Sequence, residues 1–231
     1  MTTTGLQRLL DDALRRDPGR PALVAPGPPL SYGALEGAAA VVAAGLWSHG
    51  LRPGDRVAWR LPNGPEAVML SLACYRIGAI SVPINARLAV AEVKAMLARI
   101  EPGCVVLPGE EAEQGAALGQ TVLTWPALLT EPPIEPVRDL PEDHPALILF
   151  TSGSTGQPKG VVHSHRGCLA AIDTCRLALD LNADDVVLVG KPLSHAGGLQ
   201  THCCPRAAQK SHQPGFLRSD TPPRESMSPM S

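Results

Sequence analysis

Apolar runs of strand length alternate with segments of helical period along most of this chain. Leucines fall on one face of residues 4–15 and predict a first helix. The short runs 22–24 and 30–32 bracket a Pro-Gly-Pro-Pro turn, and this arrangement predicts a β-hairpin. Ser31 is then placed to cap an alanine-rich helix that reaches Ser48.

The same alternation continues beyond Gly50. The apolar face of the helix expected over residues 89–100 runs from Val90 to Ile100. Strands that alternate with helices are typical of an α/β fold with a mostly parallel, helix-flanked sheet. We expect strands over residues 57–61, 79–84, 104–107, 146–150 and 185–190, and further helices ending near residue 76 and spanning residues 166–181.

One long apolar run, residues 67–84, is interrupted by Arg76 and Gly78. We therefore interpret it as a buried helix followed by a core strand rather than as a membrane span. Residues 131–145 differ from their surroundings, because prolines and acidic residues are frequent there, and we expect a surface loop.

The most specific pattern of the chain lies between two of the expected strands and reads Thr-Ser-Gly-Ser-Thr-Gly-Gln-Pro-Lys-Gly. Glycines let the backbone approach an anion closely, hydroxyls donate hydrogen bonds, and lysine adds a positive charge. The pattern therefore predicts a polyphosphate-binding loop. Its proposed ligand-binding residues are Ser152, Gly153, Ser154, Thr155, Gly156 and Lys159.

Two other interpretations of this loop fit less well. In a Walker A loop the lysine precedes Ser or Thr and a helix follows, whereas Lys159 precedes Gly160 and a β-type run. A flexible Gly/Ser linker would not sit between two strands with a Pro-Lys-Gly segment in register. We expect a phosphate-binding loop of another kind.

Composition narrows the function classes. A formal net charge of −2 over 231 residues argues against a nucleic-acid-binding surface. The 6 cysteines form no Cys-x-x-Cys pair, and the N-terminus shows no secretory signal pattern, so we expect reduced thiols in a cytoplasmic protein. The segment His202-Cys203-Cys204 lacks a second ligand pair at zinc-site spacing, and we predict no metal site.

The loop resembles the phosphate loop of the adenylate-forming (AMP-binding) superfamily, which includes acyl- and aryl-CoA synthetases. Three weaker segments, 30–35, 54–57 and 75–85, resemble other family motifs in the right order, and the likeness covers about residues 5–201. It implies the α/β core of the family's large N-terminal domain, in incomplete form. It also implies ATP and Mg²⁺ as cofactors and activation of a small carboxylic acid, with coenzyme A as the acceptor thiol.

The resemblance implies roles for individual residues as well. The loop from Thr151 to Gly156 would bond the β- and γ-phosphates, and Lys159 would supply electrostatic stabilisation there. His195 would line the carboxylate pocket, although a histidine that only packs in a loop is the alternative. Gly197 and Gly198 would let the acyl group approach closely.

Other residues that could carry chemistry are expected to be structural. His163 and His165 flank the strand that follows the loop, and we interpret them as structural or capping groups rather than bases. Cys168 and Cys175 lie on the helix expected next and are interpreted as packing residues.

Past residue 201 the chain departs from the family pattern. The adenine-binding turn that also positions the magnesium carboxylate, the ribose-binding aspartate and the lid lysine have no counterpart. We expect a partial AMP-binding domain over residues 1–201 and an unrelated, disordered tail over residues 202–231, arising from another reading frame or an alternative end.

Three hypotheses follow from this departure. The chain is a truncated acyl-CoA synthetase without turnover, a non-catalytic nucleotide- or partner-binding module, or a non-functional translation product. Strands left without neighbours would be open edges that promote association. The identity of the acid, the choice between coenzyme A and a carrier thiol, and the oligomeric state stay open.

Overall fold

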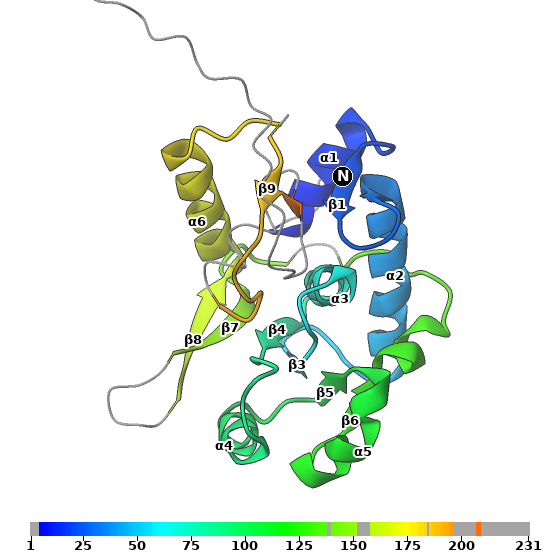
Figure 1. The fold of residues 1–231 in the computed structure, drawn as a ribbon, viewed down its shortest axis with the longest axis vertical. Coiled ribbons are helices and arrows are strands. Elements are labelled where there is room, and N and C mark those ends of the chain that lie inside the picture. Colours follow the sequence, from blue (N-terminus) through cyan, green and yellow to red (C-terminus); the bar gives the residue numbers. More distant parts are fainter. Residues whose placement is uncertain (1–4, 138–139, 152–157, 184, 196–206, 209–231) are drawn as a thin grey trace, which may run out of the picture.

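The computed structural model describes residues 5–137, 140–151, 158–183, 185–195 and 207–208 of the chain (Figure 1). The helices are α1 (Gln7–Arg16), α2 (Tyr32–Ser48), α3 (Pro65–Ile77), α4 (Val90–Ile100), α5 (Ala112–Gly115) and α6 (His165–Ala178), with 3-10 turns η1 (Gly109–Glu111), η2 (Ala116–Leu118) and η3 (Trp125–Leu129). The strands are β1 (Pro21–Val24), β2 (Leu30–Ser31), β3 (Arg56–Trp59), β4 (Ile80–Pro83), β5 (Cys104–Leu107), β6 (Val122–Thr124), β7 (Pro145–Thr151), β8 (Lys159–Ser164), β9 (Val187–Leu188) and β10 (Ala207–Ala208).

The larger sheet is six-stranded, in the order β6-β5-β3-β4-β7-β8. Its neighbouring strands are parallel except for β8, which runs antiparallel to β7. Strands β4 and β5 are buried at every position, as expected for parallel strands that are covered on both faces. The predicted α/β class with a mostly parallel, helix-flanked sheet is confirmed.

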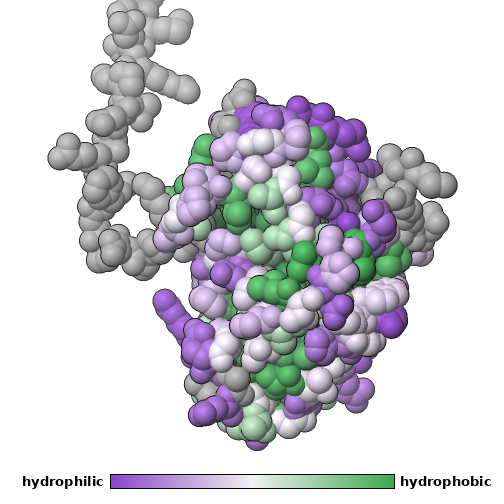
Figure 2. All heavy atoms as spheres, turned by 90° about the vertical axis from the view of Figure 1, so that its right-hand side faces the viewer, coloured by the Kyte–Doolittle hydropathy of each residue, from purple (hydrophilic) through white to green (hydrophobic). Residues whose placement is uncertain are grey.

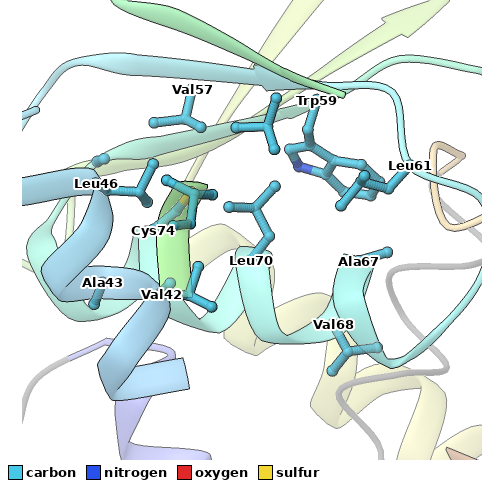
Figure 3. Close-up of a cluster of buried hydrophobic side chains, with 14 of the residues drawn as sticks. Val42, Ala43, Leu46, Val57, Trp59, Leu61, Ala67, Val68, Leu70 and Cys74 are labelled. Atoms are coloured by element: carbon cyan, nitrogen blue, oxygen red, sulfur yellow. The ribbon is translucent and has the colours of Figure 1, made fainter. Parts of the chain in front are cut away.

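Helices cover the two faces of this sheet separately. Val57 and Trp59 of β3 pack with α2 and α3 in one hydrophobic cluster (Figure 3). Ala58, the residue between them, packs with α4 in a second cluster. Because successive strand residues point to opposite faces, α3 and α4 must lie on opposite sides of β3.

The smaller sheet has the order β2-β1-β10-β9. β1 and β2 are antiparallel, which confirms the predicted hairpin, and Ser31 accepts a hydrogen bond from the Ala34 amide at 3.1 Å as the predicted cap of α2. β10, within the segment expected to be a tail, pairs with β1 and β9. The boundary between residues 201 and 202 stays a prediction.

The run 67–84 forms α3 and β4, as predicted, and no helix among the described residues combines the length and apolarity needed to cross a membrane. One detail of the predicted core is wrong. Val90 is 37% exposed, whereas Val93, Met96 and Leu97 are buried. Val90 opens the helix and does not belong to the cluster that α4 covers.

The outer surface on the side of α2 carries apolar residues in separate patches with hydrophilic residues between them (Figure 2). Apolar side chains are also exposed on the larger sheet. Val161 and Val162 on β8, the last strand of the larger sheet, are 42% and 58% exposed. An apolar outer strand of this kind is the open edge that the sequence predicts to promote association.

Helix α2 approaches η3 so closely that only glycine fits at residue 45. A Cβ atom there would lie 2.4 Å from the carbonyl oxygen of Leu128. We expect Gly45→Ala to lower the free energy of unfolding by about 1–3 kcal/mol, because backbone has to move. The matched control is Gly37→Ala on the same helix, where a Cβ meets no atom within 4 Å. This change should stabilise by up to about 1 kcal/mol through helix propensity. Urea denaturation of both variants distinguishes these effects, and equal midpoints would contradict the expected clash.

Candidate functional site

The predicted phosphate loop lies between β7 and β8, at the end of an antiparallel hairpin. Thr151 ends β7 and faces Lys159, which begins β8, and the Thr151 hydroxyl donates to the Lys159 carbonyl at 3.4 Å. Both residues are exposed. The structure therefore holds the first and last of the predicted phosphate-binding residues side by side. The others, Ser152, Gly153, Ser154, Thr155 and Gly156, lie outside the described residues.

Helix α4 contacts this loop at the residue that precedes β8. The Arg99 guanidinium donates through Nη1 to the carbonyl oxygen of Pro158 at 2.6 Å. Pro158 directly precedes Lys159, so this contact fixes where the lysine leaves the loop. No sequence pattern singles out Arg99, which belongs to no motif and lies 59 residues from its partner.

A crevice lies outside the carboxyl ends of β3 and β4. It has a volume of about 600 Å³ and is lined by residues that follow β3, residues that follow β4, and the segment after β9. The strands lead to α3 and α4 on opposite faces of the sheet, which makes this the topological switch point where open α/β sheets bind ligands. Residues of these three segments that contribute to the lining include Asn63, Glu66, Asn85, Arg87, Pro192 and Ser194.

Asn63 joins two walls of the crevice. Its side-chain amide donates to the Lys191 carbonyl at 2.9 Å, and its Oδ1 accepts from the Leu193 amide at 2.9 Å. The Asn63 side chain thus makes two hydrogen bonds to the segment that leads to His195. Asn63 was not expected to have this role, although an asparagine within the Pro-Asn-Gly-Pro segment was a possible signal.

His195 is exposed, and its amide donates to the Pro192 carbonyl at 3.1 Å. It follows Ser194 of the crevice but does not itself line it. Its proposed role in the carboxylate pocket stays a prediction. Gly197 and Gly198 lie outside the described residues.

His165 has the structural role predicted for it. It is 1% exposed, and its Nδ1 accepts a hydrogen bond from the Leu6 amide at 3.2 Å. Burial, followed by the nearby His144, lowers the pKa of His165 to about 4. A neutral, enclosed imidazole of this kind ties the N-terminal segment to α6.

Three of the described cysteines, Cys74, Cys104 and Cys168, are buried and form no disulfide. Burial raises the pKa of Cys168 to about 11 and the pKa of Cys104 to about 12, and it raises that of Cys74 well above its usual value. These thiols stay protonated and unreactive at neutral pH. Cys168 packs in the core as predicted, while Cys203 and Cys204 lie outside the described residues.

Among the residues that the structure describes, no group of three or more His, Cys, Asp or Glu side chains could hold a metal ion. A mostly parallel, helix-flanked sheet with a crevice at its switch point, and a glycine- and hydroxyl-rich loop sequence, are typical of α/β proteins that bind phosphorylated ligands. A family model described as AMP-binding enzyme matches residues 10–225. The chain belongs to this family, as its resemblance to adenylate-forming enzymes implied.

Curated relatives agree with this assignment. A feruloyl-CoA synthase of Amycolatopsis sp is 37% identical over 194 residues, which are 83% of this chain and 40% of the relative. A fatty acid–[acyl-carrier-protein] ligase, ScoC of Streptomyces coeruleorubidus, is 34% identical over 80% of this chain and 38% of its own length. The chain thus spans about 40% of the length of these relatives.

Solved structures show the same fold. Apo MatB from Rhodopseudomonas palustris aligns with a TM-score of 0.79 at 27% identity, over 89% of this chain and 44% of MatB. The N-terminal subdomain of Klebsiella oxytoca NpsA in complex with 3-hydroxybenzoyl-AMSN aligns with a TM-score of 0.78 at 27% identity, over 93% of this chain and 55% of that subdomain. The incomplete large N-terminal domain predicted from the sequence is confirmed.

Proposed function

We propose that this chain supplies the ATP-binding part of an acyl- or aryl-CoA ligase. In that reaction a carboxylate oxygen attacks the α-phosphate of ATP and pyrophosphate leaves, giving an acyl-adenylate. A thiol of coenzyme A or of a carrier protein then attacks the acyl carbon, and AMP leaves. The observation that carries the proposal is the β7–β8 hairpin, which holds Thr151 and Lys159 face to face at the ends of the family's phosphate loop.

Different residues of the loop are proposed to have different roles in the first step, the attack on ATP. Charge accumulates on the leaving pyrophosphate, so preorganised donors and a cation lower the barrier. Residues 151–156 are proposed to donate hydrogen bonds to the β- and γ-phosphates, while the Lys159 ammonium neutralises their charge. Mg²⁺ would accompany ATP. Because the described residues hold no cluster of metal-ligating side chains, we assign the ion no protein ligand.

The acid is proposed to lie near His195, Gly197 and Gly198, next to the crevice that Asn63 helps to shape. Residues 1–201 would form the partial domain and residues 202–231 a tail of unrelated sequence. The relatives' names include both aromatic and fatty acids, so the proposal extends to the class of acyl and aryl carboxylates. ATP and coenzyme A, together with the buried thiols of Cys74, Cys104 and Cys168, accord with a cytoplasmic location.

The loop should bind ATP through Lys159. We expect Lys159→Ala to raise the dissociation constant for ATP about tenfold, the effect of one charge-assisted hydrogen bond. Isothermal titration calorimetry of the purified chain measures it. The control is Lys94→Ala on the exposed face of α4, which should bind ATP like the wild type. Equal affinity of the wild type and Lys159→Ala would refute the assignment of the loop.

We expect the 231-residue chain by itself not to catalyse formation of an acyl-adenylate. Its relatives are more than twice as long, and losing even one transition-state donor costs about 10²–10³ in rate. We therefore expect no pyrophosphate release above background when ATP is mixed with decanoate, ferulate or benzoate. A coupled pyrophosphate assay tests this. Release that requires both ATP and an acid would show that the chain is catalytically sufficient, while the calorimetry would still report on the loop.

A further inference from the structure

A second cavity lies apart from the crevice, between α1, α2, α3 and α6. It has a volume of about 390 Å³ and shares no lining residue with the crevice. Its walls are largely aliphatic, and the following wall residues are each at most 5% exposed: Leu6, Leu10, Leu23, Leu35, Val68 and Ile172.

The size and lining of this cavity indicate the kind of molecule that fits. An apolar cavity of about 150 Å³ stays dry and binds benzene. The present cavity, at about 390 Å³, falls within the range of pockets that bind small organic ligands. Because the walls offer aliphatic surface and few polar groups, the buried part of a ligand should be an alkyl chain.

The mouth of the cavity indicates the head group. Four charged residues line the cavity, Asp12 and Arg16 from α1 and Asp173 and Arg176 from α6. Asp12 is half-buried and the other three are exposed, which places them where the cavity meets solvent. Asp12 is paired with Arg15, and the Arg176 Nε lies 3.7 Å from an oxygen of Asp173. Within the described part of the chain, Arg16 alone of these four makes no ion pair. The uncompensated charge at the mouth is therefore positive.

We propose that this cavity binds a medium-chain alkyl carboxylate, with its chain between the helices and its carboxylate at Arg16. The site is separate from the proposed ATP site, since neither Lys159 nor Asn63 lines it. Its occupation therefore does not depend on the proposed ligase function.

The test uses decanoate and the whole 231-residue chain in isothermal titration calorimetry. Saturable binding of decanoate is expected, with weaker binding of decylamine, which has the same chain and the opposite charge. Ala13→Phe narrows the cavity from α1 and should abolish binding. Its control is Ala98→Phe, which adds the same ring at an exposed position of α4 and should leave binding unchanged.

The head group is tested separately. Arg16→Gln should weaken decanoate binding about threefold, as expected for a solvent-exposed ion pair, and leave decanol binding unchanged. Arg8→Gln on the same helix is the control, because Arg8 does not line the cavity. Arg16 is exposed, so this variant stays informative even if Ala13→Phe does not fold.

Several outcomes would overturn the proposal. These are an absence of saturable decanoate binding, undiminished binding by a folded Ala13→Phe variant, or equal affinity for decanoate and decylamine. Loss of decanoate binding in Arg8→Gln to the same extent as in Arg16→Gln would also reject the assigned head-group site. ATP binding, measured on the same samples, reports on the proposed function independently.

Discussion

Arg76→Met should lower the free energy of unfolding by about 3 kcal/mol, the lower end of the range for breaking a buried ion pair. Arg76 is 7% exposed and pairs with Glu36 of α2. Its Nε donates to the Ile134 carbonyl at 2.7 Å, and its own carbonyl accepts from the Val137 amide at 2.8 Å. The variant would leave the Glu36 carboxylate and the Ile134 carbonyl without their donor.

The control for this prediction is Arg15→Met. Arg15 also pairs with an acid, Asp12, but their side chains are 61% and 48% exposed. Exposed pairs contribute about 0–1 kcal/mol. Urea denaturation measures both variants, and equal losses would contradict a special role for Arg76. Adding Glu36→Leu to Arg76→Met should restore part of the stability, because the half-buried Glu36 carboxylate is then no longer left unpaired.

Acidification should destabilise this protein through His165 by about 2–3 kcal/mol between pH 7 and pH 4.5. Burial lowers the folded-state pKa of His165 from 6.5 to about 4. Between these values the unfolded chain binds a proton that the folded chain excludes. The stability from neutral His165 is therefore fully present above pH 6.5 and is lost as the pH falls toward 4.

The surroundings of His165 disfavour the charged form of its ring. Nδ1 accepts from the Leu6 amide, so the proton of the neutral ring is on Nε2, which is buried and has no partner among the described residues. His144 stacks on the ring at a centroid distance of 6.2 Å, and Tyr75 meets its edge at 5.9 Å. Gly5, at φ +69°, has no room for a Cβ, which would lie 2.7 Å from the imidazole.

His165→Asn isolates this contribution. Asparagine offers an acceptor oxygen near the position of Nδ1 and does not titrate in this range. Urea denaturation at pH 7 and pH 4.5 should show a smaller loss of stability for the variant than for the wild type. His163→Asn, two residues earlier on β8, should keep the wild-type loss. If His165→Asn loses as much stability on acidification as the wild type, His165 is not the responsible group.

The order of elements and the candidate loop were predictable because their signals are local. A strand buried on both faces has a continuous apolar run, as in β4 and β5, and an amphipathic helix shows its period, as in α4. The loop motif is contiguous, so the sequence alone named Thr151 and Lys159. The position of Val90 was mispredicted, because periodicity marks an apolar stripe but not where the covered surface ends.

What the sequence determined by itself is the α/β class, the family and the loop that is proposed to bind ATP. The tertiary structure alone decided which distant groups meet: Asn63 with Leu193 across 130 positions, and Leu6 with His165 across 159. Asn63 and Leu193 meet at one end of the sheet, and Leu6 and His165 meet at the start of α6, because the connections between strands bring distant segments together. No local pattern encodes that proximity. The crevice, the second cavity and the buried His165 therefore became visible only once the helices were placed on the sheet.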